Sequence, residues 1–146
     1  MLKTVSAAAL AAACFVSFPV HADELQVKAL NRGAAGFFVF EPELVRIQPG
    51  DIIDFIVVDK GHDVHSVSGM IPDGAQPFEG RTNQDMKVTF SKPGVYVIAC
   101  QLHTRMGMVG VVVVGDPMNL DKIDPSVLPP KAKTKLQALL GQIKGG

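Results

Sequence analysis

The sequence predicts an all-β fold, an antiparallel β-sandwich of about eight short strands. Short apolar or alternating segments recur along the chain, and turns rich in its 14 glycines and 10 prolines separate them at spacings of roughly ten residues. With 146 residues, the chain is long enough for one compact domain. The expected strands cover residues 24–30, 36–40, 43–50, 51–59, 63–69, 86–91, 95–100 and 108–115.

The N-terminal residues 1–22 have the pattern of a secretory signal peptide. Lys3 gives a positive start, residues 5–20 are almost wholly apolar, and VHA at 20–22 matches the small-x-small cleavage pattern. A retained membrane anchor is the alternative, but the apolar run is too short for a membrane-spanning helix. We therefore expect a mature domain of residues 23–146, and the bacterial type of this leader makes the periplasm its expected location.

Removal of the leader leaves Cys100 as the single cysteine, because Cys14 is removed with it. Lys3 is removed as well, so 13 basic side chains remain against 14 acidic ones, and this balance argues against a nucleic-acid partner. One cysteine cannot form an internal disulfide. An exported thiol is open to oxidation unless it is buried, bound to a metal or used as a nucleophile.

The C-terminal tail has helical rather than strand patterning. Residues 119–124 could form a short helix capped by Asp116 or Asn119. After two prolines, apolar residues then recur at helical spacing at Leu136, Leu139, Leu140 and Ile143. We expect this second helix to pack on the sandwich. A membrane-surface or partner-binding helix is the alternative, for which four apolar residues are a modest stripe.

The segment CQLHTRMGM concentrates potential metal ligands. Cys100 ends one expected strand and Met108 begins the next, so a hairpin would bring both together with His103 between them. The segment KGHDVH supplies two further histidines, His62 and His65. An odd separation places these on opposite faces of a strand. His62 is favoured, because it lies in a loop and loops gather at the ends of a sandwich.

These donors comprise one thiolate, two imidazoles and one thioether. Two histidines and a cysteine with a weak axial methionine form the type 1 (blue) copper site of electron-transfer proteins. We therefore expect one copper ion per chain in an electron carrier that is not an enzyme. Zinc would gain little from a methionine. The alternatives are a buried structural cysteine, a Cys–His nucleophile pair and a periplasmic copper chaperone with an open, Met-rich site.

Several stretches resemble the cupredoxin family and, within it, the pseudoazurins. They are GH at 61–62, GMIPDGA at 69–75, KVTF at 87–90, PGVY at 93–96, the C-x2-H-x4-M loop and GMVGVVVVGD at 107–116. The resemblance spans the mature chain. It implies a Greek-key cupredoxin β-sandwich with two C-terminal helices, and it implies that Met106 lies beside the copper without binding it. The copper ligands that it implies are His62, Cys100, His103 and Met108.

The resemblance also implies transient redox partners, namely a nitrite reductase and, as another possibility, a c-type cytochrome. We also expect a monomer that binds neither nucleic acid nor membrane. Some positions depart from the pseudoazurin pattern, which usually has Asn where Asp63 stands and Pro where Leu102 stands. An aspartate can accept but not donate through its side chain, so the hydrogen bonding between the ligand loops is expected to change. Thr104, Arg105 and His65 also depart from the pattern, and His65 is expected at the surface.

Overall fold

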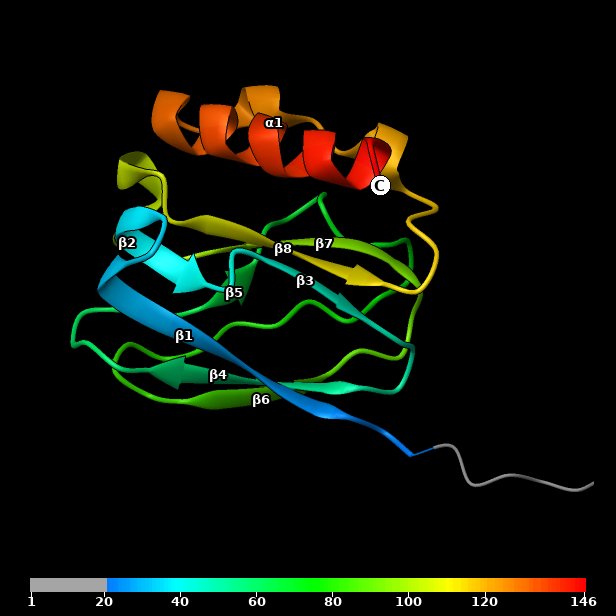
Figure 1. Ribbon diagram of the computed structural model, residues 1–146, viewed down its shortest axis with the longest axis horizontal. Coiled ribbons are helices and arrows are strands. Elements are labelled where there is room, and N and C mark those ends of the chain that lie inside the picture. The colour runs from blue at the N-terminus through cyan, green and yellow to red at the C-terminus, as the bar shows by residue number, and fades with distance from the viewer. Residues whose placement is uncertain (1–20) are drawn as a thin grey trace, which may run out of the picture.

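The computed structural model describes residues 21–146, so the predicted leader lies almost wholly outside the described residues. Two four-stranded sheets face each other, and a C-terminal helix covers one of them (Figure 1). The sheet orders are β2-β1-β4-β6 and β3-β8-β7-β5. The strands are β1 (Glu24–Gly33), β2 (Gly36–Glu41), β3 (Leu44–Ile47), β4 (Ile52–Val57), β5 (His65–Ser66), β6 (Met86–Thr89), β7 (Gly94–Ala99) and β8 (Val109–Val114).

The predicted β-sandwich is confirmed, but its pairing is mixed rather than wholly antiparallel. Neighbours such as β1–β2 and β7–β8 pair antiparallel, whereas β1–β4 and β3–β8 pair parallel. The parallel pairs join strands that are not consecutive, so local alternation could not reveal them. The strand expected over residues 63–69 is also shorter than predicted, because only β5 pairs there.

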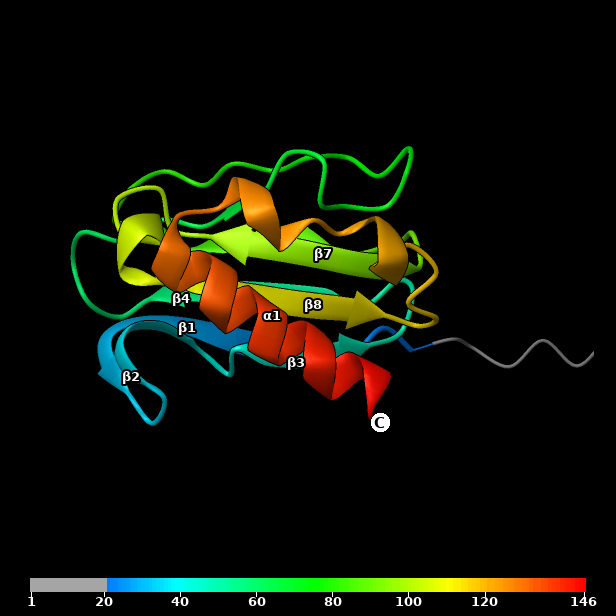
Figure 2. The ribbon, with the colours of Figure 1, turned by 90° about the horizontal axis from the view of Figure 1, so that it is seen from above.

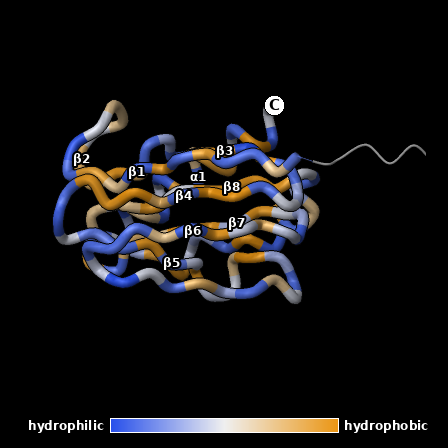
Figure 3. Tube along the Cα trace, turned by 90° about the horizontal axis from the view of Figure 1, so that it is seen from below, coloured by the Kyte–Doolittle hydropathy of each residue, from blue (hydrophilic) through white to orange (hydrophobic). Residues whose placement is uncertain are grey.

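The central strands β7 and β8 are buried on both faces, which explains their nearly continuous apolar sequences. Alternate side chains serve different cores. Tyr96 and Ile98 face the other sheet, whereas Val95 and Val97 belong to the cluster under the C-terminal helix. Figure 2 shows this helix lying across β8 and toward β3, and Figure 3 shows hydrophobic residues along the strands.

The second predicted C-terminal helix is confirmed as α1 (Pro130–Lys144). Its apolar stripe packs on the sandwich, as predicted. The buried residues of α1 are Ala132, Leu136, Leu139, Leu140 and Ile143. Within residues 21–146, none of the helices is long and apolar enough to cross a bilayer.

The first predicted helix, at residues 119–124, is replaced by two 3-10 turns, η2 (Leu120–Lys122) and η3 (Pro125–Val127). Asn119 precedes η2 but does not cap it. Its side-chain oxygen accepts the Val95 N–H at 2.6 Å, and its amide donates to the Val95 carbonyl at 3.0 Å. A tertiary contact with β7 therefore uses the polar group that was expected to start a helix.

Candidate metal centre

One end of the sandwich collects the four side chains that the sequence singles out. His62 lies in the loop between β4 and β5, and Cys100 directly follows β7. His103 lies in the loop between β7 and β8, and Met108 directly precedes β8. The antiparallel pairing of β7 and β8 extends to the residues next to the strands, because the Cys100 N–H donates to the Met108 carbonyl at 3.2 Å.

The loop between Cys100 and Met108 is held by its own hydrogen bonds around the 3-10 turn η1 (Thr104–Met106). The His103 N–H donates to the Cys100 carbonyl at 3.2 Å, and the Met108 N–H donates to the His103 carbonyl at 3.1 Å. The Thr104 hydroxyl donates to the Cys100 carbonyl at 2.6 Å. Gly107 closes the turn with φ of +94°, which glycine adopts without steric cost. These bonds and the glycine turn define the conformation of the loop.

The thiol and two imidazoles converge at this end. The Cys100 sulfur lies 3.8 Å from Nδ1 of His62 and 3.5 Å from Nδ1 of His103, and the three atoms all lie within 4.8 Å of one another. Two donors that bind one first-row metal ion at about 2.0–2.3 Å, separated by 110–120° at the metal, are about 3.5–3.8 Å apart. The spacing therefore fits a shared metal ion, and the soft thiolate with imidazoles suits copper.

The two methionines of the segment are placed differently. Met108 is completely buried and belongs to the same hydrophobic cluster as Cys100, between the two sheets. Met106 is 51% exposed at the rim of the loop. Met108 thus brings a buried thioether to the strand end that carries Cys100, whereas Met106 faces solvent.

Comparison with known proteins identifies the family. The sequence matches the family of copper binding proteins, plastocyanin/azurin type, over residues 27–115. The chain belongs to this family. It is 41% identical to a pseudoazurin of Paracoccus pantotrophus, over 94% of this chain and 95% of the relative. It is 45% identical to a pseudoazurin of Methylorubrum extorquens, over 96% of this chain and 95% of the relative.

The structural comparison agrees with the sequence comparison. The fold matches the structure of a pseudoazurin from Sinorhizobium meliloti with a TM-score of 0.81 and 40% identity, covering 85% of this chain and 98% of that one. The resemblance to the pseudoazurins and the predicted cupredoxin fold are therefore confirmed. The cofactor is copper, and the protein is a pseudoazurin-type electron carrier with redox-protein partners, not an enzyme.

In this cupredoxin, Asn31 at the end of β1 orients His62. Nε2 of His62 lies 2.9 Å from the Asn31 side-chain oxygen. That oxygen can only accept, so Nε2 carries the hydrogen and Nδ1, which faces Cys100, has the free lone pair. Burial and the nearby His103 lower the pKa of His62, which favours the neutral imidazole that a metal requires. The sequence offered no signal for this role of Asn31.

The second imidazole of the cupredoxin site, His103, is only partly buried and stacks on Phe38 of β2. The ring centroids are 4.4 Å apart and the planes differ by 17°. Phe38 has φ of +52°, a left-handed conformation that is costly for an aromatic residue. The flanking β1–β2 register places Phe38 opposite Asn31. The cross-strand pair formed by Asn31 and Phe38 therefore contacts both histidines. Sequence analysis assigned neither residue a function.

The electrostatics of the cupredoxin site favour a protonated thiol when no metal is bound. Burial raises the pKa of the Cys100 thiol above its usual range, while backbone N–H groups of Asp63, His103 and Leu102 oppose the shift. A metal ion that binds Cys100 must therefore displace this proton, which makes copper affinity dependent on pH.

Asp63 links the two ligand loops, as its predicted acceptor role requires. Its Oδ1 accepts the Gln101 backbone N–H at 2.9 Å, so the residue after His62 is joined to the residue after Cys100. His65 lies outside the group formed by the thiol and the two imidazoles. Nδ1 of His65 is instead 3.5 Å from Asp63 Oδ1, and its side chain is 27% exposed.

Proposed function

We propose that the protein carries single electrons in the periplasm through a type 1 copper site and donates them to a nitrite reductase. The observation that carries this proposal is the convergence of one thiol and two imidazole Nδ1 atoms at one end of a cupredoxin sandwich. The bound copper supplies a one-electron couple. The proposed ligands are His62, Cys100, His103 and Met108.

The export pattern of residues 1–22 supports the periplasmic location, with residues 23–146 as the mature cupredoxin domain. The β7–β8 framework supports the electron-carrier role. Cys100 and Met108 are anchored at adjacent strand ends, and both are fully buried. Donor atoms held in this way move little when the charge of the site changes, and small rearrangement favours rapid electron exchange.

His103 provides the route to a partner, because it is the least buried of the proposed ligands. Leu102 is 61% exposed and Met106 is 51% exposed on the same loop, and they present an apolar surface around the imidazole. Such a surface can meet another protein without displacing tightly bound water. In a complex docked there, only the His103 side chain would separate the partner from the copper site.

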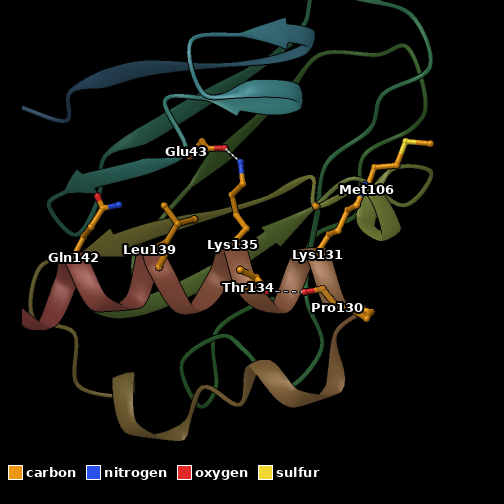
Figure 4. Close-up of a pocket in the computed structure, with 10 residues that line it drawn as sticks. Glu43, Met106, Pro130, Lys131, Thr134, Lys135, Leu139 and Gln142 are labelled. Atoms are coloured by element: carbon orange, nitrogen blue, oxygen red, sulfur yellow. Dashed lines mark hydrogen bonds and ion pairs between the residues drawn. The ribbon is translucent and has the colours of Figure 1, made fainter.

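Basic side chains surround this apolar surface. Arg105 belongs to η1. Lys131 packs closely against Gly107 of the same loop, because a Cβ atom built on this glycine would lie 3.5 Å from the Cβ of Lys131. Figure 4 shows Met106 and Lys131 at one end of a groove along α1. Lys60 precedes Gly61, which lies beside the His103 ring. Positive charge here favours a partner with an acidic docking face and accelerates the encounter.

The partner is tested by mixing reduced protein with a periplasmic copper-containing nitrite reductase in a stopped-flow instrument. We expect bimolecular oxidation that slows as ionic strength rises, because salt screens the attraction. Arg105→Ala should slow the reaction at low salt, whereas Lys144→Ala, at the far end of α1, should not. If a c-type cytochrome exchanges electrons rapidly and the reductase does not, the proposed acceptor is wrong.

A copper chaperone is the competing function. It would require ligands open to exchange, whereas Cys100 and Met108 have no exposed surface. An electron carrier should give a reversible one-electron voltammogram and retain copper against a moderate Cu(I) chelator. Rapid loss of copper to the chelator would favour the chaperone.

The proposed role of Met108 as a copper ligand is tested by Met108→Leu. We expect copper to stay bound and the reduction potential to rise, because a weak donor to Cu(II) is lost. Met106→Leu is the matched control and should leave the potential close to that of the wild type. A lower potential in Met108→Leu would contradict the role of Met108 as a ligand.

A further inference from the structure

We propose that the buried side chain of Asp63 lowers the reduction potential of the copper site, beyond its role in joining the ligand loops. This inference rests on the proposed function, since it concerns the proposed site. Asp63 is a positioning and tuning residue rather than a ligand. The argument depends on one oxygen atom that the loop contact does not use.

The buried polar side chains of the protein differ in how well they are satisfied. Asp51 is 7% exposed, and each of its oxygens accepts one backbone N–H, at 2.9 and 2.8 Å. Asn119 is satisfied through both its oxygen and its nitrogen. Asp63 is 3% exposed and uses only Oδ1; among residues 21–146, Oδ2 is the one buried side-chain oxygen or nitrogen without a partner.

The hydrogen bond from the Gln101 N–H requires an acceptor oxygen at position 63, but it does not require a charged carboxylate. A neutral amide would accept the same N–H and would avoid burying an unpaired charge, which is costly. Nδ1 of His65 lies 3.5 Å from Oδ1, the oxygen that is already used. An ionised carboxylate shares its charge between both oxygens, and Oδ2 has no hydrogen-bond donor to stabilise its share inside the protein.

This charge lies beside the copper-binding residues. Asp63 directly follows His62, and its side chain is hydrogen-bonded to the residue after Cys100. A buried negative charge stabilises Cu(II) more than Cu(I), because the attraction grows with the charge of the ion. The reduction potential is lower as a result, and the site becomes a stronger electron donor.

The direct test is Asp63→Asn, which keeps the shape and the acceptor to Gln101 and removes the charge. Voltammetry at one pH and one ionic strength should give a higher potential than the wild type. A nearby charge changes such an equilibrium by about tenfold, which corresponds to about 59 mV for one electron. Metal-free Asp63→Asn should also unfold at the same or a higher temperature. An unchanged or lower potential would overturn the proposal.

Asp51→Asn is the matched control, because it removes a buried carboxylate at the opposite end of β4, about 20 Å away along the strand. It should reduce thermal stability, since one of its hydrogen bonds is lost, and leave the potential unchanged. A shift equal to that of Asp63→Asn would show that loss of net charge alone is responsible, and would overturn the proposal.

His65→Arg tests the same charge with Asp63 left in place, and it serves if Asp63→Asn fails to fold. A permanent positive charge beside the carboxylate should raise the potential, by less than Asp63→Asn does. An unchanged or lower potential in this variant would also overturn the proposal. If the wild type itself gives no reversible one-electron couple, the proposed function has failed and not the role of Asp63.

Discussion

The protein has two hydrophobic cores that share the strands β7 and β8 but differ in composition. The core between the sheets contains aromatic rings and the sulfur atoms of Cys100 and Met108. The core under α1 contains aliphatic side chains and Met70. Successive residues of the same strands therefore serve the copper site on one face and the attachment of the helix on the other. Function and stability should consequently respond to different mutations, although the residues are neighbours in sequence.

The largest functional effect is expected for Cys100→Ser in the core between the sheets. The serine oxygen cannot replace the thiolate, so the intense visible absorption of the oxidised copper protein should disappear. Met106→Leu, which changes the exposed sulfur of the same loop, should keep the absorption. An unchanged spectrum in Cys100→Ser would refute the role of this cysteine.

The largest stability effect is expected for Leu136→Ala in the core under α1, where Leu136 has no exposed surface. Truncation should lower the free energy of unfolding by about 2–5 kcal/mol, because transfer energy is lost and a cavity remains. Denaturant unfolding of the metal-free protein measures this change. The visible spectrum of the copper form should stay the same, and a clear spectral change would show that the two cores are coupled.

A smaller effect is expected for Asn31→Ala, which removes the acceptor that orients His62. Loss of such a partner typically lowers metal affinity by about 10–100-fold. Competition with a chelator of known affinity gives the measurement. Arg32→Ala, the next position on β1, is the control and should bind copper as the wild type does; equal losses in both variants would remove the specific role of Asn31.

The smallest effect is expected for Phe38→Leu, which removes the ring stacked on His103. An aromatic pair contributes about 0.5–1.5 kcal/mol beyond its buried area. We expect a loss of stability of that order in the metal-free protein. Phe37→Leu changes the neighbouring ring, which is 67% exposed, and should have little effect. If both variants lose equally, the stacking itself contributes nothing measurable.

The features that could be predicted from the sequence are those determined by short, local segments. The hairpin around CQLHTRMGM and the helix α1 were predictable, because alternation and helical spacing are local. His62 was preferred over His65 because it lies in a loop, and loops gather at the ends of a sandwich.

The features that could not be predicted depend on distant pairing. The parallel β1–β4 and β3–β8 pairs join segments that no local pattern connects. Asn31 and Phe38 reach the histidines only because the sheets bring the β1–β2 hairpin to that end of the sandwich. Asn119 appeared to be a helix cap, but its tertiary bonds to Val95 prevailed. In each case, packing between remote segments decided the outcome.

The most direct test of the account is a titration of the metal-free wild type with Cu(II), followed by visible spectroscopy. We predict an intense absorption that saturates at one copper per chain, disappears on reduction by one electron and returns on oxidation. Copper binding without this absorption, or an absorption that does not saturate at one equivalent, would contradict a type 1 site built from the buried cysteine.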